Sequence, residues 1–286
     1  MESFINLFLN GLATGMLIFL LAAGLTLIFG LMDVLNFAHG GLFAWGAYAG
    51  AAAFASTGSL AAAVGAALVA GAALGFALER FIIKPVYGNH IQQILITLGV
   101  MIVLGELLKV VWGPNPLSSG VPSWLQGSWS FGGIVLIKYR LFIIAVGLVV
   151  LTALHLVMTR TKLGLIVRAG VANKEMVQAL GIDIKKVFAV VFMLGCAIAA
   201  VGGALFGPYS GVIYAEMGLE FGILAFIVVV IGGMGNLLGS AFASLLVGLS
   251  GAFMAYFLPE LSLAVNMLLM VAVLLFKPSG LFGVKS

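Results

Sequence analysis

The sequence predicts an all-α protein, a polytopic transmembrane helical bundle, and three observations support this fold class. Of the 286 residues, 63% are hydrophobic and only 8% are charged, whereas soluble domains are about half apolar and about a quarter charged. The charges are also clustered, so that residues 3–32, 34–78, 187–215 and 221–259 carry none. Because one bilayer-spanning helix needs about 20 apolar residues, the second and fourth of these stretches each hold two helices.

Charge clusters and stretches rich in Pro, Gly, Asn or Ser divide the chain into nine apolar segments, each a candidate helix. In chain order they cover residues 4–30, 40–56, 60–78, 90–111, 140–158, 187–208, 221–234, 238–257 and 261–276. The first, fourth and sixth are long enough to cross a bilayer unaided. The seventh and ninth are short, so we expect one of them to be re-entrant or tilted differently, and about 8–10 spans in all. Seven GxxxG pairs barely exceed chance for 39 glycines and indicate only general small-residue packing.

The basic residues predict which side of the bundle faces the cytoplasm. Ten of the thirteen lie in three connections that the nine-segment division places on one side of the membrane. These connections are the one with Arg80 and Lys84, the segment 160–186, and the tail from Lys277. Because short loops rich in Lys and Arg are cytoplasmic, we expect a cytoplasmic C-terminus and an external N-terminus. A loop at about 112–137, rich in Pro, Gly, Ser and Trp, is expected on the outer side.

Several function classes are disfavoured by composition and motifs. A lone cysteine, Cys196, cannot form an internal disulfide, and a net charge of +4 is too small and dispersed for nucleic-acid binding. No His, Cys, Asp or Glu cluster has metal-ligand spacing. No lysine follows a glycine, so the chain has no P-loop and is expected to be a non-enzymatic subunit. The N-terminal apolar run is too long for a signal peptide, so we expect the first helix to remain in the mature protein.

A polar turn interrupts the apolar sequence at residues 30–41. It holds Asp33, Asn36 and His39 at spacings of three, which would share one face of a helix, and it ends in a glycine pair that could instead break the helix. One interpretation is a solvated turn at the cytoplasmic boundary. The other is a broken helix beside a translocation path, because irregular backbone at membrane depth occurs only in protein or along a watery cavity. The candidate pathway residues are Asp33, Asn36, His39, Gly40 and Gly41.

The basic connection 160–186 predicts a short, stiff helix. Asn173 is placed to cap residues 174–180, Gly181 stands where a left-handed C-terminal residue is favoured, and Asp183 is placed to cap the next membrane helix. Apolar Met176, Ala179 and Leu180 share one face of this helix. Two interpretations remain open: an interfacial helix lying on the lipid headgroups, or a docking knob that inserts into a soluble partner.

These segments resemble a known family. Leu27–Gly41 (LIFGLMDVLNFAHGG), followed by Gly-Ala-Tyr at 46–48, is similar to the signature of the H-type permease of branched-chain amino acid ABC importers. Arg168-Ala169, followed by Ala-Leu-Gly-Ile at 179–182, resembles the cytoplasmic coupling segment of that family. The glycine-rich stretch 232–236 and the tail 277–283 fit it as well.

The resemblance implies a function and a set of partners. The whole chain, 1–286, would be one transmembrane permease domain in the bacterial inner membrane. A second permease subunit, M-type or another copy, would complete the pathway for leucine, isoleucine or valine, which a periplasmic protein delivers. Two cytoplasmic ATPases would hold ATP and Mg²⁺ and bind the coupling segment, so this chain needs no cofactor. The coupling residues implied are Arg168, Ala169, Asn173, Met176, Ala179, Leu180, Gly181 and Ile182.

Other functions stay open at this point. Permeases for urea, short amides or other amino acids share the same signature. An ion-coupled secondary transporter is a rival from another class, but it needs ionisable groups deep in the membrane, for which only Asp33 and Glu106 are candidates.

Overall fold

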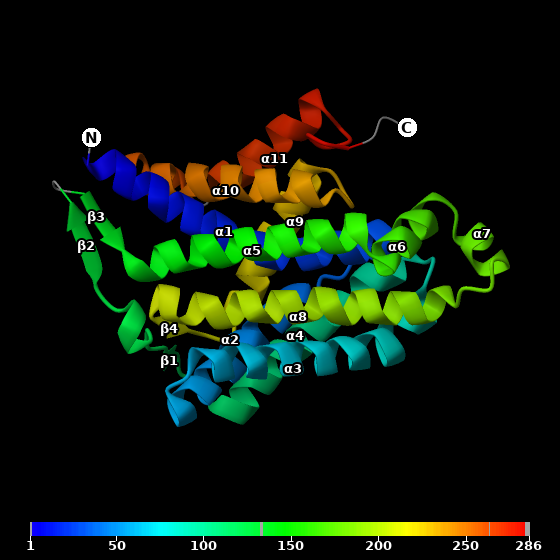
Figure 1. The fold of residues 1–286 in the computed structure, drawn as a ribbon, viewed down its shortest axis with the longest axis horizontal. Coiled ribbons are helices and arrows are strands. Elements are labelled where there is room, and N and C mark those ends of the chain that lie inside the picture. The colour runs from blue at the N-terminus through cyan, green and yellow to red at the C-terminus, as the bar shows by residue number, and fades with distance from the viewer. Residues whose placement is uncertain (1, 132–133, 263, 284–286) are drawn as a thin grey trace.

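The computed structural model describes residues 2–131, 134–262 and 264–283, and it is almost entirely helical (Figure 1). Within these ranges, each of the nine apolar segments corresponds to one helix. These are α1 (Glu2–Met32), α2 (His39–Thr57), α3 (Leu60–Leu78), α4 (His90–Trp112), α5 (Lys138–Arg160), α8 (Ile184–Ser210), α9 (Met217–Gly232), α10 (Leu237–Phe257) and α11 (Ala264–Phe276). Helices α1, α3, α4, α5, α8 and α10 are long and apolar enough to span a membrane, and α9 and α11 are shorter. The prediction of an all-α, multi-pass membrane protein is confirmed.

The remaining elements are short. Two helices, α6 (Lys162–Ala172) and α7 (Lys174–Ala179), form the connection between α5 and α8. One-turn π or 3₁₀ helices lie at Glu79–Ile83, Lys84–Val86, Ser123–Leu125 and Pro259–Leu261. The outer loop, predicted without secondary structure, contains an antiparallel hairpin of β2 (Ser128–Phe131) and β3 (Ile134–Ile137). In addition, β1 (Leu117–Ser118) pairs with β4 (Val212–Ile213), which ties this loop to the α8–α9 connection.

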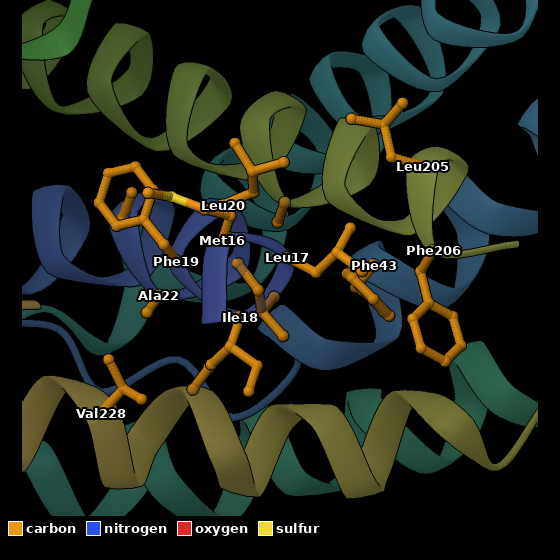
Figure 2. Close-up of a cluster of buried hydrophobic side chains, with 14 of the residues drawn as sticks. Met16, Leu17, Ile18, Phe19, Leu20, Ala22, Phe43, Leu205, Phe206 and Val228 are labelled. Atoms are coloured by element: carbon orange, nitrogen blue, oxygen red, sulfur yellow. The ribbon is translucent and has the colours of Figure 1, made fainter. Parts of the chain in front are cut away.

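Helix α1 is the centre of the bundle. Its side chains from Leu17 to Ala23 are almost completely buried. Figure 2 shows Leu17, Ile18, Phe19 and Leu20 among residues from other helices, namely Phe43 of α2, Leu205 and Phe206 of α8 and Val228 of α9. Helices α4 and α5 instead bury few of their apolar side chains completely and lie at the periphery. An apolar surface of this kind suits lipid or a neighbouring membrane subunit.

Small residues let the inner helices approach one another closely. A Cβ atom added at Gly46 of α2 would overlap the carbonyl oxygen of Ala200 in α8, and Gly11 and Gly15 of α1 face the backbone of α10. Such contacts replace the hydrophobic effect, which does not drive association between helices in lipid. Three of the GxxxG pairs, 11/15, 46/50 and 71/75, therefore lie at helix interfaces, although their number in the sequence was uninformative.

The two ends of the bundle differ. The N-terminus and the β2–β3 hairpin lie at one end in Figure 1, and α6, α7 and the C-terminus lie at the other. At this second end, the tail caps α9: the backbone N–H groups of Leu281 and Phe282 donate to the carbonyl oxygens of Ile231 (2.7 Å) and Gly232 (3.1 Å). Asn236 then links tail and loop, because its Nδ2 donates to the carbonyl of Phe282 (2.9 Å).

Candidate functional site

The chain between α1 and α2 is a break in helical structure. Helix α1 ends at Met32, and Asp33 takes a left-handed conformation with φ +57°, which is uncommon for a residue other than glycine. Residues 33–36 follow without regular structure, and α2 begins at His39. The pair Gly40-Gly41, considered as a possible helix breaker, lies within the first turn of α2, so that expectation was wrong. The break comes earlier, and Gly40 is needed instead for close packing of α2 on α9.

Helix α2 begins deep inside the bundle rather than at its surface. Nε2 of His39 donates to the carbonyl oxygen of Leu21 in α1, at 3.1 Å. Leu21 lies 11 residues before the end of α1, which is about 17 Å at 1.5 Å per residue. The segment 33–38 therefore runs back along α1 into the protein. A solvated boundary turn does not describe Asn36 and His39, which are 3% and 1% exposed.

The three polar side chains of this turn do not share one face. Asp33 is 56% exposed and lies 3.3 Å from Nε2 of His90 at the start of α4. Asn36 and His39 lie inside and are joined by a turn, in which the backbone N–H of His39 donates to the carbonyl oxygen of Asn36 (3.3 Å). The structure thus separates Asp33 from the other two polar candidates, Asn36 and His39. Their roles in transport stay a prediction.

Both buried side chains carry polar atoms without a protein partner. Among the described residues, neither Nδ2 nor Oδ1 of Asn36 and not Nδ1 of His39 makes a hydrogen bond. Most buried polar atoms in proteins are hydrogen-bonded, so a buried polar atom without a partner needs a physical explanation. The sequence signalled these residues only by their polarity within an apolar stretch.

A large open cavity lies at the end of the bundle that carries α6 and the tail. Its volume is about 660 Å³, which is in the range of about 300–1,000 Å³ that is usual for small-molecule sites. The end of α1 forms one wall, with Asp33 at its rim, and Arg168 of α6 and His155 of α5 form another. The loop at 234–236, the first two residues of α10 and the tail residue Phe282 complete it. We call this the inner cavity.

The predicted coupling segment has the local structure expected from its sequence. Oδ1 of Asn173 accepts from the backbone N–H of Met176 (2.9 Å) and caps α7. Gly181 ends the helix with φ +81°, and the N–H groups of Gly181 and Ile182 donate to the carbonyls of Gln178 and Val177, which is a complete Schellman motif. Asp183 caps α8 through the N–H groups of Lys185 and Lys186, and the hydrogen bond from Lys186 lowers the pKa of this carboxyl.

Helix α7 is anchored on one side and apolar on the other. Val177 is 2% exposed and joins the buried cluster of α1 and α8. The side chains of Met176, Ala179 and Leu180 are exposed at the tip. The sequence did not predict α6, which Thr161 caps through the N–H of Gly164 (3.2 Å). Of the other predicted coupling residues, Arg168 and Ala169 are exposed on α6, and Ile182 is half-buried. None of their roles in docking is tested by the fold.

Changing Gly181 should loosen this segment. A β-branched residue is strained in the left-handed conformation by about 1–2 kcal/mol, so we expect Gly181→Val to speed hydrogen–deuterium exchange of residues 174–180 by about fivefold to thirtyfold. Gly181→Asn is the matched control and should leave exchange nearly unchanged, because asparagine tolerates this conformation. Equal exchange in the two variants would show that the left-handed residue does not hold α7.

A charged cluster joins α4 to the beginning of α9 near the opposite end. Nζ of Lys109 forms ion pairs with Glu106 at 2.9 Å and with Glu216 at 2.8 Å. The hydrogen bond from Lys109 lowers the pKa of the Glu216 carboxyl. Tyr214 donates to Glu220 at 2.6 Å, and its pKa is raised to about 12, first by desolvation and then by that carboxylate. The ion pairs of Lys109 connect the end of α4 to the start of α9.

Comparison with known proteins points to a single family of membrane permeases. The family described as the permease component of the branched-chain amino acid transport system matches residues 7–274. The chain is 30% identical to the high-affinity branched-chain amino acid transport system permease protein BraD of Pseudomonas aeruginosa, over 96% of this chain and 94% of that protein. It is 29% identical to the permease protein LivH of Escherichia coli, over 98% and 96%, and 28% identical to LivM of the same organism, over 93% and 68%. No solved structure matches the chain at a significant level.

Proposed function

Because this chain belongs to the family of permease components of branched-chain amino acid transport systems, we propose that it carries leucine, isoleucine and valine across the bacterial inner membrane. The observation that carries the proposal is the match of nearly the whole chain to permeases whose names state this substrate class. Those names favour branched-chain amino acids over urea, short amides or other solutes. The chain is a transport component rather than an enzyme.

The proposed partners follow from the same family. A second permease subunit, of the M-type or another copy of this chain, would complete the pathway, and a periplasmic protein would deliver the solute. Two cytoplasmic ATPases would bind at α7 and hold ATP and Mg²⁺, so that no cofactor is needed in this chain. The exposed apolar tip of α7 supports a docking role, because α7 lies beyond the ends of α5 and α8 (Figure 1). The basic side would be cytoplasmic, together with the C-terminus.

The proposed mechanism is alternating access driven by the partner ATPases. Closure of the ATPases would displace α7, which is capped at both ends and anchored by Val177, so the motion would reach α5 and α8 as a rigid displacement. The broken segment with Asp33, Asn36, His39, Gly40 and Gly41 would line the path beside the inner cavity. Among the described residues, both amide atoms of Asn36 and Nδ1 of His39 have no protein partner, so they would be free to bond a passing solute.

The position of the acidic groups speaks against an ion-coupled carrier. Such a carrier needs ionisable groups deep in the membrane. The two candidates, Asp33 and Glu106, are 56% and 64% exposed and lie near helix ends, where each has a cationic or histidine partner.

Reconstitution separates the two mechanisms. The chain is incorporated into proteoliposomes with the second permease, the ATPases and the binding protein, and uptake of radiolabelled leucine is followed. We expect uptake to require both ATP and the binding protein. Unlabelled valine and isoleucine should compete with the labelled leucine. Uptake by the purified chain alone, driven by a proton gradient, would refute the proposed function.

A further inference from the structure

Helix α4 lies at the periphery of the bundle, yet two of its few buried side chains are polar. Gln93 and Thr97 are each 1% exposed, one turn apart on the same helix. Polar side chains within a membrane-spanning helix are costly and commonly serve a function. Thr97 faces the chain break between α1 and α2, and we call residues 33–38 of this break the break segment.

Thr97 holds the backbone of the break segment. Its hydroxyl donates to the carbonyl oxygen of Gln93 in its own helix (2.7 Å), and Oγ1 accepts from the backbone N–H of Phe37 (3.1 Å). Backbone outside regular helices must find its hydrogen-bond partners elsewhere, and here a side chain of another helix supplies one. Because the bond is to the main chain, the path of the break segment depends on the position of α4.

Helix α4 contacts the chain on either side of this bond as well. Nε2 of His90, in the first turn of α4, lies 3.3 Å from Asp33 at the start of the break segment. Further along, the carbonyl oxygen of Leu104 accepts from Nε1 of Trp45 in α2 (3.0 Å). Positions 90, 97 and 104 are seven residues apart and so share one face of the helix. This face of α4 is therefore attached both to the break segment and to the helix that follows it.

The connection before α4 is joined to α8. Tyr87 packs the edge of its ring against Phe188 of α8, and the two ring centroids lie 5.7 Å apart. The hydroxyl of Tyr87 donates to Oε1 of Glu79 at 2.6 Å, and this glutamate is 3% exposed. The bond to a buried carboxyl group fixes the ring of Tyr87 against α8.

Gln93 completes the link between the two ends of this arrangement. Its Nε2 donates to the carbonyl oxygen of Val86 (3.1 Å), which ties the connection before α4 to the helix that carries Thr97. Helix α8 itself begins at Ile184, just after the predicted coupling residues. A continuous series of contacts thus runs from the coupling segment through α8 and α4 to the break segment. Networks of packed and hydrogen-bonded side chains of this kind carry energetic coupling between distant sites.

We propose that α4 is the rigid link through which the coupling segment moves the break segment, with Thr97 as the positioning residue. This inference rests on the proposed function and deepens it, because it names the route by which the partner ATPases act on the path. Closure of the ATPases would displace α8, and the ring contact of Phe188 with Tyr87 would pass that displacement to α4. The bond between Thr97 and Phe37 would then shift the backbone of the break segment.

The first test measures how much leucine is transported for each ATP hydrolysed. In the reconstituted complex, Thr97→Val removes the hydroxyl with little change of shape, so the bond to Phe37 is lost. We expect leucine uptake to fall at least fivefold while ATP hydrolysis stays within twofold of that of the unchanged complex. Thr97→Ser keeps the hydroxyl and should restore uptake. A purely structural role would lower both activities together, and that result, like an unchanged ratio, would overturn the inference.

Thr152 of α5 provides the matched control. Its Oγ1 donates to the carbonyl oxygen of Leu148 (2.8 Å), which is the same bond that Thr97 makes to Gln93. Within the described chain, the hydroxyl of Thr152 makes no bond to another helix. Thr152→Val should therefore leave the ratio of leucine to ATP unchanged. An equal loss in the two valine variants would show that the bond to the break segment is not the cause.

The second test follows the displacement itself. Hydrogen–deuterium exchange of the complete complex is compared with and without a non-hydrolysable ATP analogue. In the unchanged complex, the nucleotide should alter exchange in both the coupling segment and the break segment. In Thr97→Val the response should persist in the coupling segment and fall at least threefold in the break segment.

Two results of this second test would contradict the proposed link. They are an equal response of the break segment in both complexes, and no response of that segment in the unchanged complex. If the unchanged complex takes up no leucine at all, the proposed function itself fails, which is distinct from any result with these variants.

Discussion

Replacing Ala179 by arginine is expected to abolish ATP-driven uptake and the stimulation of the partner ATPases. Ala179 is exposed beside Met176 and Leu180 at the tip of α7, so the change should barely affect folding. In a docked complex the new guanidinium would be buried without a partner, which costs about 3–5 kcal/mol. That cost is more than a hundredfold in affinity, because each 1.4 kcal/mol is a factor of ten. Uptake and ATPase activity are measured in proteoliposomes.

The matched control adds the same charge to the neighbouring position. Gln178 lies about a quarter turn from Ala179 on the same helix and is not part of the apolar face, so Gln178→Arg is the control. It should keep most of the activity, and membrane insertion of both variants should equal that of the unchanged chain. Normal uptake by Ala179→Arg would mean that this face does not dock an ATPase.

Replacing Gly40 by alanine is expected to cause a large loss of stability. A Cβ there would overlap the carbonyl oxygen of Gly218 and lie 2.7 Å from the Cα of Gly222, both in the backbone of α9. Because backbone atoms cannot rotate away, the cost should reach the upper end for overpacking, about 3 kcal/mol or more. We expect a fall in Tm of about 6 °C or more, measured by thermal unfolding in detergent.

A glycine in open space provides the comparison. Gly65 in α3 has no atom within 4 Å of the position that a Cβ would take. Gly65→Ala should leave Tm unchanged or raise it slightly, because alanine favours helix by about 0.5–1 kcal/mol over glycine. A similar loss in both variants would show that close contact between α2 and α9 is not the cause.

The helices and caps could be predicted because their signals are local. Each of the nine apolar segments corresponds to one helix of the described chain. Asn173, Gly181 and Asp183 cap helices as expected, because a capping residue acts only on neighbouring backbone groups. Helix α6 was missed because its eleven residues are too few for a membrane span and lie in a connection recognised by its basic residues. The β1–β4 pairing was missed because it joins residues about 95 positions apart.

The break before α2 could not be placed from the sequence. Gly40 follows a polar stretch and resembles a helix breaker. The reason for a glycine at this position is instead its close contact with α9, nearly 180 residues later in the chain. The separation of Asp33 from Asn36 has a similar origin. It depends on residues 33–38 folding back along α1, and that path is fixed by contacts such as the hydrogen bond of His39 to Leu21. Spacing along the chain carries no information about such contacts.

The central position of α1 has a consequence for biosynthesis. This helix is made well before its neighbours α8, α9 and α10, since α10 ends 225 residues after α1 (257 minus 32). At about 5–20 residues per second, the ribosome needs roughly 11–45 s to supply them. During that time the most enclosed helix of the finished protein is surrounded by lipid, and it must later exchange those lipids for its own C-terminal half. Assembly is therefore completed only at the end of translation.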